Sequence, residues 1–334
     1  MKYVAFICAL VSFLIVIFLT PLLMRYLRKI GLVVKDMNKE NTPLVPLSGG
    51  VAVVAGTIGG LMLFIFLRKF FFTTDSIITL DLESLMILFA AMFSMFLVTF
   101  IGFLDDLFIR KDKESSDGLK QWQKPILTLA AAVPLMIIGA GTTVMGLPIF
   151  GRVDVGILYP LLFVPLGVLG ASNMVNMLAG FNGMETGIGI VAIGSLGLFA
   201  FFNGSYLAAL IGLMVFISLI AFFLFNKYPA KILPGDSLTY LIGGTIAVLA
   251  IVGNIERAAI IVSIPFFIEF ILKARKKFRA DSYGYYYNGN VKSKYDKIYS
   301  LPHIFTRTGR FTEKQITFFM VTIELFFAAL IWLV

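Results

Sequence analysis

The chain contains a series of apolar blocks, each long enough to cross a lipid bilayer. A helix spans the hydrocarbon core with about 17–25 apolar residues. Ten such blocks can be read from the sequence: 3–27, 47–67, 84–104, 124–141, 155–178, 184–202, 206–225, 237–253, 258–274 and 315–334. Hydrophobic residues make up 59% of the 334 residues and charged residues 14%, a composition that excludes an ordinary soluble domain. The sequence predicts an all-α polytopic membrane protein with ten transmembrane helices in one integral membrane domain, residues 1–334.

Basic residues are concentrated in the loops that follow odd-numbered blocks. Of the 28 Lys and Arg residues, only Lys2, Arg68, Lys69, Arg152 and Arg257 lie on the other side. By the positive-inside rule the basic side is cytoplasmic, so both termini are extracytoplasmic. We expect most of these basic residues to set topology alone. The cytoplasmic loops are then 28–46, 105–123, 179–184, 226–236 and 275–314.

The outer loop 142–154 contains Gly and Pro turn signals. We expect it to form a small hairpin at the membrane surface.

Polar side chains recur at the cytoplasmic ends of the blocks, where such residues usually have a functional or structural role. Asp105 and Asp106 end the third block side by side, and Asp236 begins the eighth. Others are Asn173, Asn176, Asn182, Glu185, Glu269 and the only histidine, His303, near Arg307 and Arg310. Ionisable groups at membrane depth usually face a water-filled cavity. Simpler roles are also open: Asn173 as a link between helices, and Asp236 as a helix N-cap.

These acids and amides form an oxygen-rich set of candidate ligands. Such sets suit Mg²⁺ or Mn²⁺, whereas a single Cys and a single His argue against zinc. Basic residues flank the acids: Lys111, Lys113, Lys120, Lys124, Lys227, Lys231, Arg307 and Arg310. Carboxylates that alternate with cations indicate a magnesium-bound diphosphate, and a divalent cation would remove the repulsion between Asp105 and Asp106.

Three strings in this order, "FIGFLDD", "NMVNMLAGFNGMETG" and "FNKYPAKILPGDSLTYLIGG", resemble the signature blocks of the polyprenyl-phosphate N-acetylhexosamine-1-phosphate transferases. The resemblance extends from about Gly31 to Arg310. It is strongest to the eukaryotic and archaeal dolichyl-phosphate GlcNAc-phosphotransferase branch, since "KDMNKENTPLVPLSGG" is also similar to a cytoplasmic segment of that branch.

The chain also departs from its relatives in informative places. It has Ala179 and Asn182 where the muramoyl-pentapeptide enzymes have aspartates, and "PHIFTR" where they have a histidine cluster. These differences argue against a peptidoglycan substrate. The eukaryotic enzymes carry a long insertion that the segment from Ala274 to Lys314 lacks, which favours an archaeal cell membrane over the endoplasmic reticulum.

The resemblance implies transfer of GlcNAc 1-phosphate from UDP-GlcNAc to a dolichyl-type phosphate, which yields a lipid-diphosphate-sugar and UMP. The implied catalytic residues are Asp105, Asp106, Lys124, Asn176 and His303. The implied substrate-binding residues are Lys39, Asn173, Asn182, Glu185, Glu269 and Arg307. The implied magnesium ligands are Asp236, Asp106 and Asn182. Glu269 is equally compatible with a buried structural role, and Glu324 is interpreted as structural.

Because a phosphomonoester is largely a dianion near neutral pH, we expect Asp105 and Asp106 to organise charges. Proton abstraction by Asp105 is the second interpretation.

Other functions are weighed against this one. The same reaction with another UDP-N-acetylhexosamine is the first alternative, and a membrane transporter is a more distant one, since its charges would lie near the bilayer midplane. A membrane prenyltransferase would repeat an acid four residues after Asp105, where this chain has Ile109. A non-catalytic scaffold would gain nothing from so many buried ionisable groups. A homodimer is an expected assembly, and no nucleic-acid partner is predicted.

Overall fold

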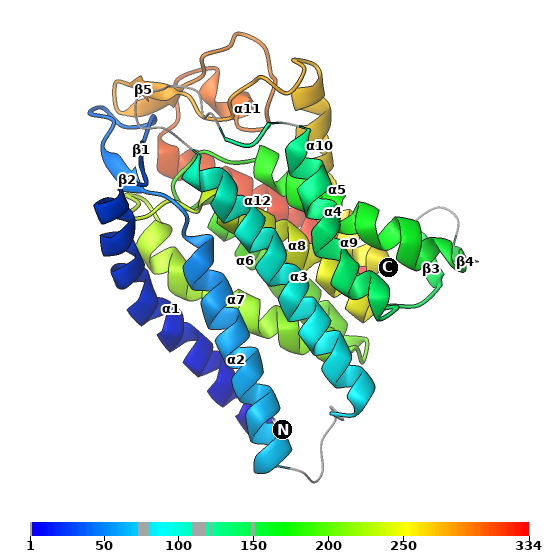
Figure 1. Ribbon diagram of the computed structural model, residues 1–334. Coiled ribbons are helices and arrows are strands. Elements are labelled where there is room, and N and C mark those ends of the chain that lie inside the picture. The colour runs from blue at the N-terminus through cyan, green and yellow to red at the C-terminus, as the bar shows by residue number, and fades with distance from the viewer. Residues whose placement is uncertain (1, 73–79, 109–117, 121, 148–150, 334) are drawn as a thin grey trace.

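The computed structural model describes residues 2–72, 80–108, 118–120, 122–147 and 151–333. They form a bundle of long helices with short hairpins and loops at its ends (Figure 1). The helices are α1 Lys2–Ile30, α2 Gly50–Phe70, α3 Leu82–Leu107, α4 Gln123–Ile137, α5 Val164–Met177, α6 Met184–Phe202, α7 Tyr206–Asn226, α8 Gly235–Gly253, α9 Glu256–Val262, α10 Ile264–Ala274, α11 His303–Thr306 and α12 Glu313–Leu330. A π-helical turn, Tyr159–Phe163, precedes α5, and a 3₁₀ turn, Ile331–Leu333, follows α12.

Eight helical segments within the described residues are long and apolar enough to cross a membrane. They correspond to every predicted block except the fourth and the ninth, so the chain is a polytopic membrane protein. The fourth block forms α4, which is apolar but has only 15 residues.

The ninth block, 258–274, is not the single continuous helix that the sequence suggested. It is divided at Ser263 into α9 and α10. Pro265 explains the break: it has no backbone N–H to donate, and it is favoured in the first turn of a new helix.

The structure contains three two-stranded antiparallel hairpins in its described residues. The hairpin predicted within 142–154 is confirmed as β3 (Val144–Leu147) paired with β4 (Gly151–Asp154). The other two were not predicted. They are β1 (Val33–Lys35) with β2 (Leu44–Pro46), and β5 (Tyr285–Tyr287) with β6 (Asn290–Lys292).

Helix α8 is the most deeply buried of the membrane-spanning candidates, and its glycines allow neighbouring backbones to approach closely. A Cβ atom at Gly243 would lie 2.3 Å from the carbonyl oxygen of Ala171 in α5. A Cβ atom at Gly102 of α3 would lie 2.3 Å from the carbonyl oxygen of Asp236 at the start of α8. Small residues at helix contacts permit such approach in membranes. As a result, the polar ends of α3, α5 and α8 meet.

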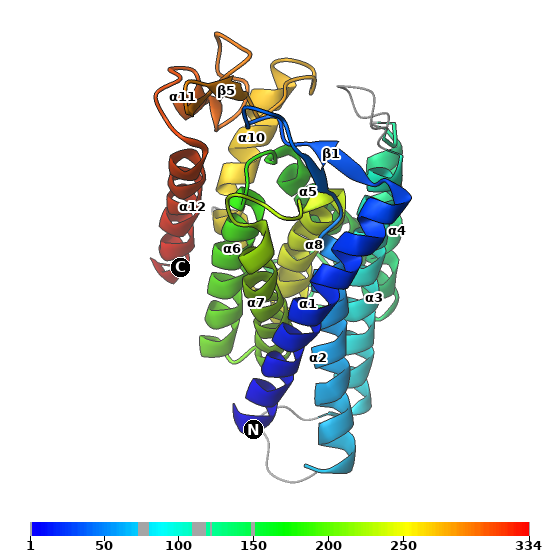
Figure 2. The same ribbon diagram turned by 90° about the vertical axis from the view of Figure 1, so that its left-hand side faces the viewer.

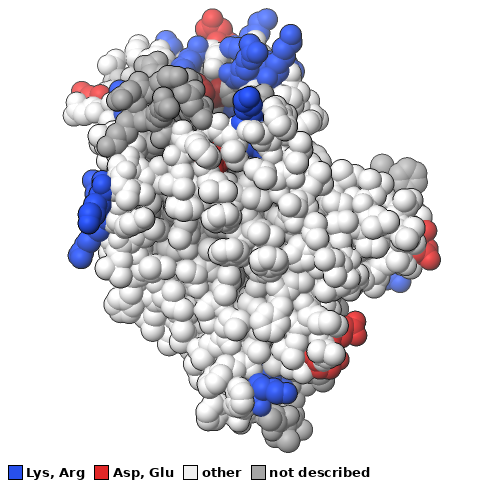
Figure 3. All heavy atoms as spheres, viewed as in Figure 1, with Lys and Arg blue, Asp and Glu red and all other residues white. Residues whose placement is uncertain are grey.

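The loops that the sequence assigns to one side of the membrane are gathered at one end of the bundle. Figures 1 and 2 show β1, β2, β5 and α11 at this end, with the N-terminus at the opposite end. Lys and Arg side chains crowd the same end of the face seen in Figure 3, while the middle of that face is almost free of charged side chains. This polar end contains the candidate site.

Candidate active site

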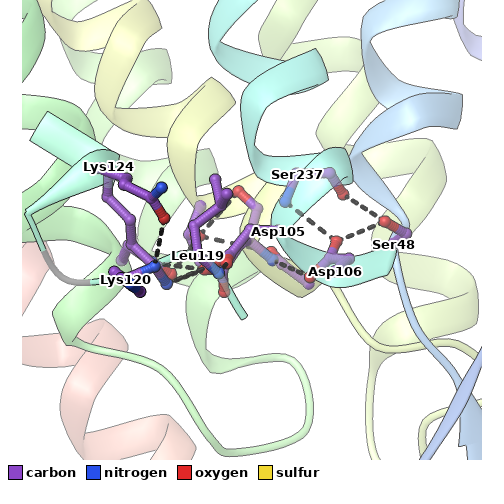
Figure 4. Close-up of polar contacts among 12 residues, drawn as sticks. Ser48, Asp105, Asp106, Leu119, Lys120, Lys124 and Ser237 are labelled. Carbon is purple, nitrogen blue, oxygen red and sulfur yellow. Dashed lines mark hydrogen bonds and ion pairs between the residues drawn. The ribbon is translucent and has the colours of Figure 1, made fainter. Parts of the chain in front are cut away.

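Asp105 and Asp106 lie in the last turn of α3, and the structure gives the two carboxylates different partners (Figure 4). Asp105 forms an ion pair with Lys124 and accepts a hydrogen bond from the backbone N–H of Leu119. Asp106 faces the start of α8 instead. Both side chains are buried. The unfavourable contact between adjacent carboxylates is therefore offset by separate sets of donors.

Asp106 ties three segments together. It accepts hydrogen bonds from the backbone N–H groups of Asp236 (2.8 Å) and Ser237 (3.3 Å) and from the hydroxyl of Ser48. The first N–H groups of a helix have no partner within the helix, and they attract negative charge. Asp106 thus caps α8 from another helix. The fit requires Gly235, whose φ is +70° and where a Cβ atom would lie 2.3 Å from Asp106 Oδ2.

Lys124 bridges two carboxylates at the mouth of the bundle. Its Nζ pairs with Asp105 and lies 3.1 Å from Asp236 Oδ2. Asn176 Nδ2 donates to the same Asp236 oxygen at 2.9 Å, and Asn176 Oδ1 accepts from the hydroxyl of Thr239 at 2.8 Å. Thr239 therefore fixes which end of the Asn176 amide faces Asp236. We call Asp105, Lys124, Asn176 and Asp236 the acid–lysine cluster.

The acid–lysine cluster is reachable from solvent. The side chains of Lys124 and Asp236 are 23% and 25% exposed, whereas that of Asp105 is only 3% exposed. A partly exposed ion pair can give up its contacts within the protein when a charged ligand binds, because the ligand supplies new partners of opposite charge. The cluster could therefore bind an anionic group through Lys124 and a cation through Asp236.

The donors of this cluster fit a hard divalent cation. The two carboxylates are ligand types that Mg²⁺ accepts, whereas the amide oxygen of Asn176 faces Thr239 and is turned away from them. Lys124 already places positive charge between the carboxylates. Within the described ranges, no three His, Cys, Asp or Glu side chains are grouped closely enough to hold a metal. A bound Mg²⁺ would then take its remaining ligands from water or from substrate phosphate, which is its usual behaviour.

A second polar group joins β1, the 179–184 loop and α12. Asn182 donates to Asp36 Oδ2 at 3.0 Å, while its own oxygen accepts from the backbone N–H of Ala230 at 2.9 Å. Lys39 pairs with Asp36 at 3.2 Å and with Glu313. In the described part of the chain, no hydrogen bond or ion pair connects this group to the acid–lysine cluster. The predicted residues Asn182 and Lys39 thus lie together but apart from Asp236.

Glu185 is buried in the first turn of α6, next to this second group. Its Oε1 accepts a hydrogen bond from the backbone N–H of Gly180 at 2.6 Å. The carbonyl of Gly180 in turn accepts from Asn38 Nδ2 at 2.7 Å. Glu185 therefore shapes the glycine loop that precedes its own helix.

Glu269 and His303 belong to a third polar group that folds the segment 275–314. Glu269 accepts hydrogen bonds from Ser300 Oγ (2.7 Å), the backbone N–H of Leu301 (2.7 Å) and Ser282 Oγ (3.3 Å). It also lies 3.8 Å from Lys273 Nζ. The carboxylate is completely buried. Every one of these partners is a protein group, so the structure places Glu269 as an internal anchor.

His303 is buried in the same way, with both ring nitrogens occupied. The backbone N–H of Tyr299 donates to Nδ1 at 3.2 Å, and Nε2 lies 2.9 Å from the carbonyl oxygen of Asp281. This pattern requires the neutral ring with its proton on Nε2. Burial lowers the pKa of His303, which favours the same neutral form.

The remaining predicted residues lie elsewhere. Asn173 donates to Thr128 Oγ1 in α4 (3.0 Å) and to the carbonyl of Leu169 (2.8 Å), the pattern expected of a link between helices. Arg307 is exposed just after α11. The flanking cations Lys111 and Lys113 lie outside the described residues.

Several residues of the site had no signal in the sequence. Ser48 is buried with φ of 91°, a conformation that residues other than glycine rarely adopt. Thr239 and Glu313 could not be identified from the sequence either, because Thr239 lies inside an apolar block and Glu313 lies at the edge of one. Asp36 belongs to the segment "KDMNKE", so the resemblance pointed to its position but not to its partner.

The chain is similar to known proteins of one family. Residues 86–254 match the glycosyl transferase family 4 model. A protein of Saccharolobus solfataricus, provisionally named a UDP-N-acetylglucosamine–dolichyl-phosphate N-acetylglucosaminephosphotransferase, is 34% identical over 323 residues, which is 96% of this chain and 94% of that protein. A Sulfolobus acidocaldarius protein with the same provisional name is 30% identical over 322 residues, 96% of this chain and 93% of that protein.

Bacterial relatives are also found. The phospho-N-acetylmuramoyl-pentapeptide-transferase of Latilactobacillus sakei is 29% identical over 269 residues, 77% of this chain and 78% of that protein.

Proposed function

Because the chain belongs to glycosyl transferase family 4, we propose that its acid–lysine cluster transfers GlcNAc 1-phosphate from UDP-GlcNAc to a dolichyl-type phosphate. An oxygen of the lipid phosphate attacks the β-phosphorus. The bond from that phosphorus to the bridging oxygen breaks, and the leaving group carries its electrons away as UMP. The products are GlcNAc-diphospho-dolichol and UMP. The protein is thus a membrane-bound phosphotransferase.

The observation that carries this proposal is the bridge that Lys124 forms between Asp105 and Asp236 at the polar end, where their side chains are 3% and 25% exposed. Phosphoryl transfer needs positioned charge more than acid–base chemistry. Lys124 would bind a phosphate oxygen of the substrates, and Asp105 would hold the ammonium group in place. Asn176, oriented by Thr239, would keep the Asp236 carboxylate turned towards the site.

Magnesium fits this arrangement as a partner of the diphosphate. Asp236 would be its main protein ligand, with Asp105 beside it, and the ion would supply positive charge to phosphate oxygens. Asp106 takes a different role here from the one expected of it. Since its oxygens already accept from Ser48 and from the start of α8, it positions Asp236 and need not bind metal.

The second and third polar groups would shape the space around the cluster. Asn182, Glu185 and Lys39 hold the 179–184 loop and the segment after β1 in place, and they would form the wall on the nucleotide side. Glu269 and His303 would keep the segment 275–314 folded over the site, with Arg307 exposed on that segment as a candidate contact for the sugar or the diphosphate.

The sugar is assigned from the relatives. The two archaeal relatives whose names specify UDP-N-acetylglucosamine match nearly the whole chain, whereas the pentapeptide-transferase matches less of it at lower identity. We therefore favour UDP-GlcNAc over another UDP-N-acetylhexosamine.

The finer topology follows the charge pattern. We propose ten membrane crossings, with α4 and the α9–α10 pair as the fourth and ninth. Both termini would be extracytoplasmic, the site would face the cytoplasm of an archaeal cell, and the enzyme would work as a homodimer.

The direct test is purified protein with Mg²⁺, dolichyl phosphate and a panel of UDP-sugars, scored by UMP release. We expect turnover with UDP-GlcNAc, loss on chelation by EDTA and recovery with added Mg²⁺ or Mn²⁺. Tunicamycin should inhibit. Turnover with only UDP-MurNAc-pentapeptide would move the chain to the bacterial activity, and no UMP release with any sugar would refute the proposal.

A further inference from the structure

The turn that follows α10 combines exposed cations with an exposed aromatic ring. We call residues 275–279 the α10 turn. Four of its five residues are basic: Arg275, Lys276, Lys277 and Arg279. Within the described ranges none of the four forms an ion pair with a carboxylate. A cluster of unneutralised cations next to a membrane helix can be explained by topology alone, so the geometry of the turn has to carry any further role.

The four cations divide into two that hold the turn and two that face outwards. Arg275 donates to the carbonyl oxygen of Ile298 at 3.3 Å, and Lys276 Nζ lies 3.9 Å from the centre of the Tyr295 ring. These contacts fasten the turn to the segment 295–299. Lys277 and Arg279 are exposed. Topology alone does not require a basic turn to be fastened by contacts like those of Arg275 and Lys276.

The backbone of the α10 turn is held in an unfavourable conformation. Lys277 and Phe278 have φ of 52° and 59°, a region that favours glycine. The turn is closed by hydrogen bonds from the N–H groups of Lys277 and Phe278 to the carbonyls of Ala274 and Lys273, both 2.9 Å. Lys273 itself is buried and donates to the carbonyl of Ala280 at 2.5 Å. Residues persist in such conformations only when their surroundings enforce them.

The result of this turn is the placement of Phe278. Its ring centroid lies 5.2 Å from that of Phe270 on α10, and the side chain is 38% exposed. Phe270 belongs to an exposed apolar face of α10 that also includes Phe267 and Ile271. Phe278 thus extends the exposed apolar strip of α10 to the position of Lys277 and Arg279. An apolar strip bordered by cations is the arrangement that binds at the headgroup region of a bilayer.

We propose that the α10 turn is a binding surface for anionic lipids of the surrounding membrane. Lys277 and Arg279 contact the lipid phosphates, and the Phe278 ring inserts at the boundary between headgroups and acyl chains. The charge of the turn selects anionic lipids, and the ring fixes the depth at which it sits. The segment 275–314 is thereby attached to the membrane surface at its beginning. This surface is separate from the proposed chemistry and stands or falls without it.

The test uses the full chain in nanodiscs of phosphatidylcholine with or without phosphatidylglycerol, with bound lipids counted by native mass spectrometry. We expect phosphatidylglycerol to be retained and to raise the melting temperature. The double variant K277Q/R279Q should weaken this binding about thirtyfold, and 0.5 M salt should mimic that loss. Phe278→Gln should weaken retention, whereas Phe278→Leu should keep it.

A matched control is the variant R28Q/K29Q, which removes two exposed cations from the end of α1. We expect it to leave retention within twofold of the wild type. Equal loss in both double variants would overturn the proposal in favour of a general surface field. If K277Q/R279Q has a higher KM for dolichyl phosphate than the wild type in nanodiscs of phosphatidylcholine alone, the turn binds the substrate instead, and the proposal is overturned. Retention that does not depend on lipid charge would also overturn it.

Discussion

The acid–lysine cluster and the group around Glu269 and His303 contain the same kinds of residue at the same end of the bundle, yet they differ in how their bonds are satisfied. Lys124 and Asp236 each have few partners within the protein, and both side chains reach solvent. Glu269 and His303 are completely buried, and protein donors and acceptors occupy both oxygens of one and both nitrogens of the other. A polar group that can exchange partners can bind a ligand, whereas one that cannot will hold a segment in place.

The largest effect should come from Asp236, on the exposed side of this comparison. We expect Asp236→Ala to lower kcat by about a thousandfold, because the metal loses its main protein ligand. The measurement is UMP release at saturating substrate. The variant should still elute as a monodisperse protein, and activity close to that of the wild type would show that the metal is held elsewhere.

Lys124→Met should come next, with a loss of about a hundredfold in kcat. The variant leaves Asp105 and Asp236 without their shared cation. The half-saturating Mg²⁺ concentration should therefore fall, since the metal now neutralises both carboxylates. A rise in that concentration would contradict the bridging role of Lys124.

Glu269→Gln tests the buried side of the comparison. It should reduce the free energy of local opening of the segment 275–314 by about 2 kcal/mol, since a charged acceptor of three hydrogen bonds is lost. Hydrogen exchange of that segment provides the measurement. Glu256→Gln, which removes a buried acid bonded to Tyr159, serves as the control and should leave the exchange of 275–314 unchanged.

Ser48→Ala sharpens the contrast between the two adjacent aspartates. It removes one donor from Asp106 and should cost about 1 kcal/mol of stability, with a smaller loss of kcat than Lys124→Met. Combined with Asp106→Asn, the two effects should not add, because both substitutions alter the same Ser48–Asp106 hydrogen bond. Additive effects would mean that Ser48 does not act through Asp106.

The smallest effect concerns pH. Burial lowers the pKa of His303 below its ordinary value of 6.5, so protonation opposes the folded segment. The stability that the neutral ring contributes is complete above pH 6.5 and is lost as the pH falls below it. The protection factors of residues 281–306, which are exchange rates corrected for the intrinsic rate at each pH, should therefore fall as the pH drops below 6.5. His303→Gln, which keeps a donor and an acceptor but does not titrate, should abolish this fall.

How far the sequence could predict this protein differs between the fold and the site. Apolar blocks predict membrane helices well, because length and hydropathy are local properties of the sequence. Eight candidate membrane-spanning helices were found where they were expected. The break at Ser263 could also have been anticipated from Pro265. The roles of polar residues were harder to assign. Asp105 and Asp106 are adjacent residues of the same type, and they differ only in the groups of the folded protein that contact each carboxylate.

The sequence by itself determined a polytopic helical membrane protein with its polar residues at one end, together with the strings shared with glycosyl transferase family 4. Spacing of apolar residues and motif identity are written along the chain. Only the tertiary structure decided which of those polar residues work as a set. Helices α3, α5 and α8 are brought together by contacts at Gly102 and Gly243, between residues more than sixty positions apart. Those contacts give Lys124 two carboxylates to share.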